Sequence, residues 1–567
     1  MTKSKSIDKA QRRSIEQPAL HDRIGEWCSR HSRRCLLAAL AIGLIASLAQ
    51  FDVKPSIGGD DTSYVLQAMD FVSTGQLPPS FRTPGYPLML AFFVWIVGPN
   101  LVLLKMTSLV SFLGLIGSFF VVFRKRLDPM IFYPTLFLLA LNPLALEYSY
   151  QTYSEMLFAA VAIWSFHCIM KSAHSTKYGD VMIAAALTMA AFYVRVVGVT
   201  IAAAAVLYFA LERRWKTLIL YVIVCGVLYS PIKLQQMISG TASFGQASVL
   251  LLKNPYNATQ GNETLEGFVD RAINNLTNHL NYQIPVALSL PTSDDLAGAD
   301  GRLFPNATAL LAVACSLLVL AGMKTTLVGS SASELKVIAI FLAGYVAFIS
   351  LALQNLFATP RMMMPVIPYL TFFFLLGWRW ILVKTQGKKA PESLTSGLKA
   401  VFVGGVLAML LLTSLRTASR VNANYPILKA NLSGDEFAGF TDDWANYLKA
   451  SRWIGQNLPA VDTKVICRKP ELFLIYNRGY GVYGVYQIDQ TNPDSILAKW
   501  KRLNLTHLLY DNFQWSSTLR RYVQPVAEKF PRLFTPLHQE GRTYPSYIFR
   551  LDYDSVQIAP GIARQLP

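Results

Sequence analysis

The fold of this chain is decided by one stretch near its start, Ile57-Gly58-Gly59-Asp60-Asp61-Thr62-Ser63-Tyr64. It comes soon after the first strongly apolar segment, residues 36–51. A carboxylate at the edge of a membrane is costly unless it has a function or a partner, and here two stand side by side. The two glycines allow a sharp turn into Asp60. Residues 62–74 then fit a short helix that Gly75 ends.

Asp60 has two compatible interpretations. It can cap the helix that follows, because an aspartate at that position accepts the free amide hydrogens of the first turn. It can also serve as a base, since a carboxylate beside low-dielectric lipid can have a raised pKa. The rest of the chain decides how much weight each interpretation receives.

Composition predicts a membrane protein. Of the 567 residues, 53% are hydrophobic and 15% are charged, whereas soluble domains carry about 25% charge. Much of the net charge of +18 falls on short loops beside apolar runs, as the positive-inside rule predicts, so it does not indicate nucleic-acid binding. The six cysteines are scattered, and no CxxC or His/Cys cluster suggests a structural metal.

Apolar runs of suitable length predict about eleven membrane spans, each needing about 20 residues. A basic, disordered cytoplasmic tail, residues 1–34, is expected to direct the first span outward. The run 86–97 is short for a span, and its crossing would put Arg124-Lys125-Arg126 outside, so we expect it at the interface. The expected spans are 36–51, 101–123, 131–146, 156–170, 181–193, 196–211, 218–229, 309–323, 337–357, 362–383 and 400–415.

This topology predicts three parts: the tail 1–34, a transmembrane domain 35–418 and a C-terminal domain 419–567. The transmembrane domain has outer loops at 52–100, 147–155 and 232–304, on the same side as the C-terminal domain. In that domain, alternating apolar stretches at 464–467 and 506–510 predict strands, and the patterns at 444–456 and 495–503 predict helices. A small α/β domain is therefore expected.

Acids and cations far apart in the chain are expected to meet on the outer side. The cations that could bind a phosphate there are Arg82, Arg195, Arg271, Lys253 and Arg361. Each could instead be an interfacial side chain that reaches lipid headgroups.

Glu155 opens a helix after a tyrosine-rich turn, where an acid also favours the helix dipole. The tyrosines of that turn, Tyr148, Tyr150 and Tyr153, fit an aromatic belt at the membrane surface better than a sugar-stacking surface.

The pattern Gly-Gly-Asp60-Asp61-x-x-Tyr64, ending in Gly75, resembles the first-loop signature of the GT-C membrane glycosyltransferases. The nearest branch is the bacterial relatives of the protein O-mannosyltransferases and of the lipid A aminoarabinose transferase. Asp60 falls on the acidic position of that motif and Asp61 on its Asp/Glu neighbour. The segment Arg82-Thr83-Pro84-Gly85-Tyr86-Pro87 is similar to a basic, Pro-rich element that approaches the lipid phosphate. Arg82 replaces the lysine of the aminoarabinose branch, which leaves the sugar and the acceptor open.

The resemblance implies a polytopic α-helical protein of GT-C type, with interfacial helices and a small C-terminal α/β periplasmic domain. It further implies an inverting transferase in the bacterial inner membrane, with a polyprenyl-phosphate sugar as donor and a lipid, glycan or protein as acceptor. Asp60, Asp61 and Glu155 are then expected to be catalytic, and Tyr64, Tyr86 and Tyr153 to contact substrate. Some members use a divalent metal, so a divalent metal is possible, but one acidic pair is too little to assign metal-ligating residues here.

Two other classes of protein share this composition. A transporter or flippase for a lipid-linked saccharide is expected to carry charges at mid-membrane and internal repeats, and the sequence has neither. A non-catalytic scaffold whose C-terminal domain binds cell-wall glycan is expected to lack a cavity between the first loop and the bilayer.

Overall fold

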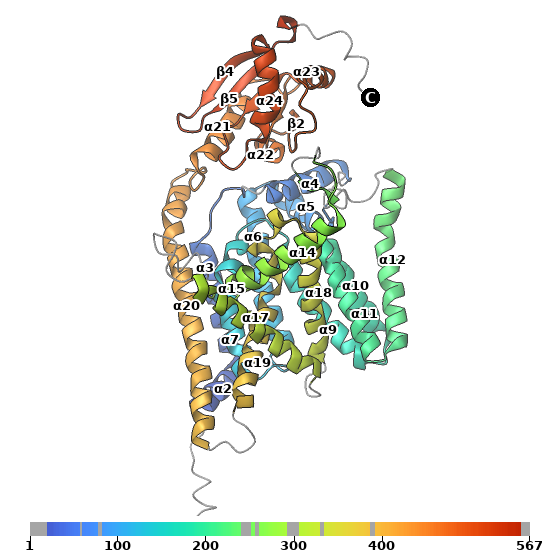
Figure 1. Cartoon of the computed structure of the whole chain (residues 1–567), viewed down its shortest axis with the longest axis vertical. Coiled ribbons are helices and arrows are strands. Elements are labelled where there is room, and N and C mark those ends of the chain that lie inside the picture. The colour runs from blue at the N-terminus through green and yellow to red at the C-terminus, as the bar shows by residue number, and fades with distance from the viewer. Residues whose placement is uncertain are drawn as a thin grey trace, which may run out of the picture.

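A bundle of apolar helices and a small sheet domain make up the molecule, and the long helix α20 (Glu392–Leu432) runs beside the bundle and up to the sheet domain (Figure 1). The computed structural model describes residues 20–56, 59–76, 82–239, 251–255, 260–291, 305–328, 334–385 and 392–556.

The bundle follows the chain in order. Its first half contains α2 (Leu20–Arg30), α3 (Ser32–Ala49), α4 (Asp60–Thr74), α5 (Gly85–Val97), α6 (Leu101–Phe123), α7 (Pro129–Leu141), α8 (Pro143–Ser149), α9 (Glu155–His174) and α10 (Tyr178–Val194). Its second half contains η1 (Val196–Gly198), α11 (Val199–Leu211), α12 (Trp215–Ser239), α14 (Leu265–Asn278), η3 (His279–Gln283), α15 (Ile284–Ala287), α17 (Pro305–Val328), α18 (Lys336–Ala352), η5 (Asn355–Phe357), η6 (Pro360–Val366) and α19 (Ile367–Thr385).

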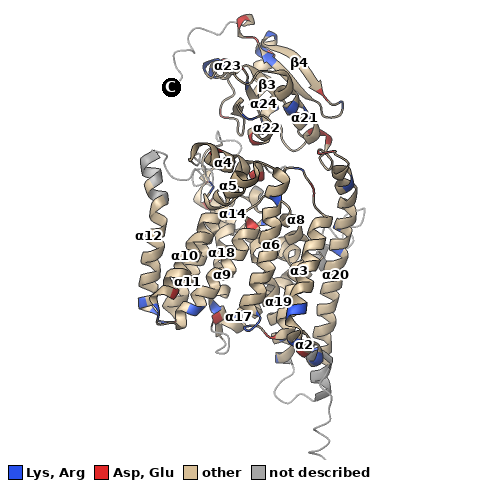
Figure 2. Cartoon of the chain, turned by 180° about the vertical axis from the view of Figure 1, so that it is seen from behind, with Lys and Arg blue, Asp and Glu red and all other residues tan. Residues whose placement is uncertain are grey.

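Six helices of the described chain are long and apolar enough to cross a membrane, or seven if the pair α7 and α8, bent by 51°, forms one span. Helices lie over all eleven expected segments, and several are shorter than a full span. The middle of the bundle carries few charged side chains, which gather toward its ends and in the sheet domain (Figure 2). The chain is therefore a multi-pass helical membrane protein, and the count of eleven spans stays a prediction.

Helices α17 and α19 approach each other closely through two glycines. A Cβ added to Gly322 would lie 1.9 Å from the carbonyl oxygen of Phe373, and one added to Gly377 would lie 1.8 Å from that of Leu318. Small residues permit such backbone contact between membrane helices, where van der Waals packing drives association. Both glycines are therefore needed for this seam.

Two expectations about irregular segments are wrong. The described part of the expected disordered tail, from residue 20, forms helix α2 over residues 20–30, and its Cys28 packs against the main apolar core. The expected outer loop 232–304 contains α14, η3 and α15 within its described part. In both segments, apolar residues spaced along a polar stretch give an amphipathic helix that packs on its neighbours.

The C-terminal domain is a mixed five-stranded sheet of order β2-β1-β3-β5-β4. Strand β1 (Lys464–Cys467) is parallel to β2 (Gly481–Gly484) and β3 (His507–Tyr510), while β5 (Ser546–Leu551) is antiparallel to β3 and to β4 (Phe534–Glu540). Its helices are α21 (Asp442–Asn457), α22 (Pro470–Tyr476), α23 (Pro493–Arg502) and α24 (Thr518–Lys529). The two expected strands and two expected helices are confirmed. Helix α20 runs to Leu432, past the boundary expected at residue 418.

The sheet domain contacts the bundle above α4. Ile475 of α22 packs against an apolar cluster that includes Tyr64 and Val65 of α4. Arg478 forms an ion pair of 3.0 Å with Asp70, at the other end of α4. Helix α4 therefore lies between the membrane bundle and the C-terminal domain (Figure 1).

Candidate active site

Helix α4 begins one residue after a turn that requires glycine. Gly59 has φ of 76° and is the N-cap of the helix, a conformation in which a side chain would be strained. Asp60 is therefore the first helical residue, and it does not cap the helix through its side chain. The capping interpretation of Asp60 is wrong, and the expected helix end at Gly75 is confirmed, with φ of 70°.

Arg361 joins the two acids that the sequence singled out. Its Nη1 donates to Asp60 Oδ2 at 2.6 Å, and its Nε donates to Glu155 Oε1 at 2.5 Å. Arg361 lies in η6, a 3-10 turn that precedes α19, and Glu155 is the first residue of α9. Elements distant in the chain thus converge above the bundle.

Two further arginines complete the cluster. Arg82 Nη2 donates to Asp60 Oδ1 at 2.5 Å, and its Nη1 donates to Ser63 Oγ at 2.6 Å. Arg195 pairs with Glu155 Oε1 at 2.5 Å and donates to Ser154 Oγ at 3.0 Å. Asp60, Glu155, Arg82, Arg195 and Arg361, which we call the arginine–acid cluster, therefore hold three guanidinium groups against two carboxylates.

The arginine–acid cluster is partly exposed. Glu155 is fully buried, whereas the side chain of Asp60 keeps 31% of its exposure. The side chains of Arg82, Arg195 and Arg361 are each 14–16% exposed. The excess positive charge and the reachable guanidinium groups suit an anion such as phosphate, which arginine binds with two parallel hydrogen bonds.

The two adjacent aspartates differ in pKa. Burial alone would raise the pKa of Asp60, but the charges of Arg361 and Arg82 and their hydrogen bonds outweigh it and hold that pKa below its ordinary value. Burial raises the pKa of Asp61 to about 6, against the amide hydrogens of Ser56 and Thr62 that it accepts. The expectation of a raised pKa is therefore wrong for Asp60 and holds for its neighbour Asp61.

Tyrosines support the cations from below. The guanidinium carbon of Arg361 lies 3.9 Å from the ring centre of Tyr153, whose hydroxyl contacts Ser56 Oγ. That of Arg82 lies 5.3 Å from the ring of Tyr64. Cations over aromatic faces are stabilised by the ring quadrupole, so both rings hold the arginines in place.

Two expectations about tyrosines need correction. Tyr86 is 1% exposed and packs edge-on to Tyr64 at 4.9 Å, so it lies in the core and does not meet the substrate. Tyr150 and Tyr153 are buried at 8% and 5% exposure and do not form a membrane belt. Both belong to the packing beneath the site.

Two of the expected cations lie away from the arginine–acid cluster. Arg271 pairs with Glu263 at 3.0 Å and lies over the ring of Phe268. Lys253 is exposed in the same segment, where its amide donates to Gly261. Among the described residues, no hydrogen bond or ion pair joins either side chain to Asp60 or Glu155, so neither is assigned to the phosphate site.

The sequence reasoning missed a buried ion pair beside the site. Lys105 of α6 is 1% exposed, and its Nζ donates to Asp52 Oδ1 at 2.6 Å and to the carbonyl oxygens of Asp52 and Lys54 at 2.7 Å. Lys105 stands alone in the apolar run 101–123, and a lone charge in a span is itself a functional signal. Its contacts fix the segment that leads from α3 to α4.

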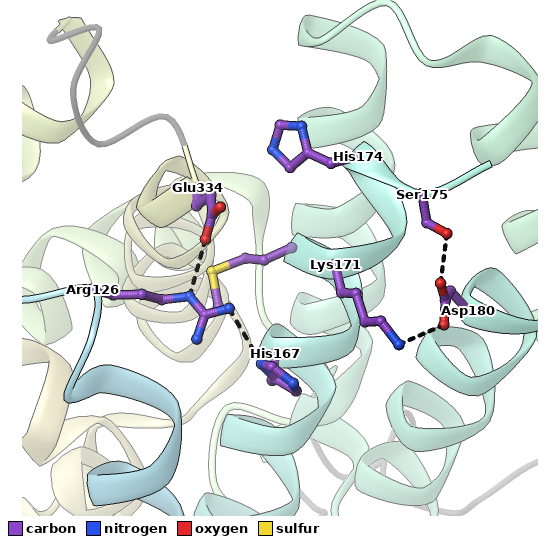
Figure 3. Close-up of a pocket in the computed structure, with 8 residues that line it drawn as sticks. Arg126, His167, Lys171, His174, Ser175, Asp180 and Glu334 are labelled. Atoms are coloured by element: carbon purple, nitrogen blue, oxygen red, sulfur yellow. Dashed lines mark hydrogen bonds and ion pairs between the residues drawn. The ribbon is translucent and has the colours of Figure 1, made fainter. Parts of the chain in front are cut away.

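A polar hollow also lies at the C-terminal end of α9, the helix whose first residue is Glu155 (Figure 3). It has a volume of about 390 Å³ and is lined by residues that include Arg126, His167 and Glu334. Arg126 donates to Glu334 at 3.0 Å, and Lys171 pairs with Asp180 at 2.9 Å. Its acids are thus paired with its own cations, and no described contact links it to Asp60.

The acids of the arginine–acid cluster do not fit a metal site. Both oxygens of Asp60 and one oxygen of Glu155 accept guanidinium groups. Across the part of the chain that the structure describes, no three His, Cys, Asp or Glu side chains gather as ligands. A divalent cation would have to displace the arginines, which have the same charge sign.

No protein-family model and no curated protein sequence matches the chain. Its structure is similar to that of ArnT from Cupriavidus metallidurans bound to undecaprenyl phosphate, with a TM-score of 0.53 at 14% identity over 92% of this chain and 98% of ArnT. For ArnT in the apo state the TM-score is 0.55 at 12% identity, over 93% and 99% of the two chains.

The oligosaccharyltransferase AglB from Archaeoglobus fulgidus, in complex with an inhibitory peptide and a dolichol-phosphate, has a TM-score of 0.51 at 13% identity. The match covers 94% of this chain and 75% of AglB. Identities this low establish the fold alone. At that level the expected resemblance to the GT-C membrane glycosyltransferases is confirmed.

Proposed function

We propose that this multi-pass membrane protein transfers a monosaccharide from a polyprenyl-phosphate donor to an acceptor of the cell envelope, with inversion at the sugar carbon. The observation that carries the proposal is Arg361, which binds Asp60 and Glu155 at once beside Arg82 and Arg195. The undecaprenyl phosphate in ArnT and the dolichol-phosphate in AglB support a lipid phosphate as the sugar carrier.

Arg82 and Arg361 are placed to bind the phosphate of the donor. Both guanidinium groups are partly exposed and face the same carboxylate. Negative charge develops on the phosphate as the bond between it and the anomeric carbon breaks, and fixed cations stabilise that charge. Arg195, which is held by Glu155 and Ser154, keeps Glu155 ionised and in position.

The donor phosphate also activates Asp60 in this proposal. Without substrate, Asp60 binds both arginines and its pKa is lowered, which makes it a weak base. A phosphate competes for the same guanidinium groups. When they turn to the phosphate, the pKa of Asp60 rises toward its ordinary value. Asp60 then accepts the proton of the acceptor hydroxyl. The hydroxyl oxygen bonds to the anomeric carbon as the bond between that carbon and the phosphate breaks, and polyprenyl phosphate leaves.

Asp61 and Glu155 act through other groups. Asp61 is fully buried and accepts two backbone amide hydrogens, so it fixes the start of α4 and does not meet the acceptor. Glu155 is fully buried and holds two arginines. Both are positioning residues for the group that reacts, Asp60.

The cellular setting follows from the same proposal. The arginine–acid cluster lies at the end of the bundle that carries the C-terminal domain, and we place that end on the periplasmic side of the bacterial inner membrane. The acceptor is a lipid, glycan or protein of that compartment. The described part of the bundle offers no observation that favours a transporter over a transferase.

The test compares an aspartate of the arginine–acid cluster with an aspartate outside it. Asp60→Asn should lower sugar transfer by about 10²–10⁴-fold, the usual contribution of a general base. Asp128→Asn, which removes an exposed carboxylate paired with Arg379 at 2.9 Å, should leave transfer near wild type. The assay supplies radiolabelled polyprenyl-phosphate sugars and envelope extract as acceptor. Full transfer by Asp60→Asn would refute the role of Asp60, and transport of intact lipid-linked sugar into liposomes without transfer would favour the flippase.

A further inference from the structure

Lys469 reaches the active site from the C-terminal domain. Its Nζ lies 3.8 Å from the position that a Cβ would take on Gly59, the residue before Asp60. The negative charges of Asp60 and Asp61 attract this ammonium group. The lysine therefore faces the acids from the side opposite to the membrane bundle.

An aromatic layer holds Lys469 beside solvent. Its Nζ lies 4.9 Å from the ring centre of Trp515 and 5.6 Å from that of Trp444, and the two indoles are stacked at 5.8 Å with an angle of 4°. Trp444 is 5% exposed, whereas Trp515 is 45% exposed. Arg468, which is buried, lies 5.0 Å from the ring of Trp515.

The position of Lys469 is fixed by the fold. It follows Arg468 at the end of β1, and its carbonyl oxygen accepts the hydroxyl hydrogen of buried Tyr447 at 2.8 Å. The next helix, α22, binds α4 through Ile475, and Arg478 pairs with Asp70 just beyond it. The contacts that dock the two parts therefore also place this lysine above the first residue of α4.

Two cations next to each other give this face of the site a local positive charge, which would attract an anionic ligand. Burial, followed by the charge of Arg468, lowers the pKa of Lys469 to about 8, although the nearby acids oppose this. A bound anion would relieve the repulsion between the two cations. The exposed indole of Trp515 adds a flat apolar surface, on which sugar rings pack.

We propose that Lys469 and Trp515 form the acceptor subsite of this enzyme, which takes a sugar ring that carries a phosphate or carboxylate group. Trp515 packs against the ring, Lys469 pairs with the anionic group, and Arg468 supports Trp515 from the buried side. This inference rests on the proposed function, because it assigns the second substrate of the same site. The donor phosphate meets Arg82 and Arg361 from the bundle, so the acceptor hydroxyl lies between the two subsites, next to Asp60.

The experiment uses the full chain in detergent, first loaded with undecaprenyl phosphate and then titrated with glucose 1-phosphate, with isothermal titration calorimetry as the readout. Glucose and inorganic phosphate are the comparison ligands. We expect Lys469→Met to weaken glucose 1-phosphate binding by about 10- to 100-fold, as for loss of a charged hydrogen bond. Lys469→Arg should restore most of the affinity. Trp515→Ala should weaken binding of glucose 1-phosphate but not of inorganic phosphate.

Lys501→Met is the matched control, since it removes an exposed lysine of α23 in the same domain, and it should bind like wild type. Unchanged glucose 1-phosphate binding in Lys469→Met, or none in wild type, would overturn the subsite. A loss of undecaprenyl phosphate binding alone would place Lys469 on the donor side and overturn the acceptor assignment. If wild type fails in the loading step, the donor proposal fails separately, and the titration still decides on Lys469.

Discussion

Arg361 donates a hydrogen bond of 2.6 Å to Asp60, a residue 301 positions earlier in the chain. The same guanidinium reaches Glu155, 206 positions earlier. One side chain therefore ties the first outer segment, the start of α9 and the turn before α19 into a single site. Its planar group matches this task because its donors diverge in a fixed plane toward two carboxylates.

Replacement of Arg361 by lysine should therefore not be conservative. An ammonium group cannot present two divergent donors in one plane, so Arg361→Lys should lower kcat/KM for the donor by about 10²–10³-fold. Arg379→Lys, in the same helix region and paired with exposed Asp128 at 2.9 Å, should remain within about twofold of wild type. Equal activity of the two variants would contradict the bridging role.

The raised pKa of Asp61 predicts that the protein becomes less stable as the pH rises. Its pKa is raised from 3.8 to about 6, so between these values the folded state binds more protons than the unfolded state. The contribution is present at low pH and is lost as the pH rises through about 6, by about 3 kcal/mol in the free energy of unfolding.

Denaturation of wild type and Asp61→Asn at about pH 4 and about pH 7 checks this prediction. Relative to Asp61→Asn, wild type should have a lower free energy of unfolding at about pH 7 than at about pH 4. Asp52→Asn is the control. It removes the carboxylate that pairs with Lys105 but keeps Asp61, so it separates the effect of Asp61 from that of the Lys105–Asp52 pair. A difference that does not vary with pH would show that Asp61 titrates normally.

The fold was largely predictable from the sequence. Hydrophobic runs and their charged flanks located the helices, because a helix that faces lipid must be apolar along its length and carry its charges at its ends. In the C-terminal domain, the short apolar runs at 464–467 and 506–510 located β1 and β3, which are buried along most of their length. Strand β4 alternates poorly and pairs with a register shift at Pro536, so its pattern carried little signal.

The site was predictable only in part. Arg82, Arg195 and Arg361 lie with the acids because topology places them on one side, and that reasoning holds for all three. Arg271 has the same topology but a nearer partner, Glu263. The side of the membrane on which an arginine lies does not determine its ion-pair partner. The partner depends on how the helices pack, and the local sequence contains no such information.

Lys105 provides a test of the buried pair. Lys105→Met leaves Asp52 without its cation in a buried setting, which should lower the free energy of unfolding by about 3–5 kcal/mol. The double variant Lys105→Met/Asp52→Asn should recover part of this loss, because no unpaired charge remains. Thermal melting in detergent measures both, and a double variant less stable than the single one would contradict this account.

The glycine seam between α17 and α19 gives a prediction independent of catalysis. Gly377→Ala should force the helices apart, since the added Cβ would lie 1.8 Å from the carbonyl of Leu318. An overpacking cost of about 1–3 kcal/mol is expected. Gly404→Ala, at a position where a Cβ meets nothing within 4 Å, is the control and should melt like wild type. Equal melting of both variants would show that the seam adapts.

Helix α20 has a consequence for experiments on intact cells. Its 41 residues correspond to a length of about 60 Å, and it runs beside the whole bundle before it leads into the sheet domain (Figure 1). A label near residue 397 and a label near residue 432 would therefore report opposite faces of the same bilayer. Two single-cysteine proteins, each probed with an impermeant reagent, would orient every other segment of the chain.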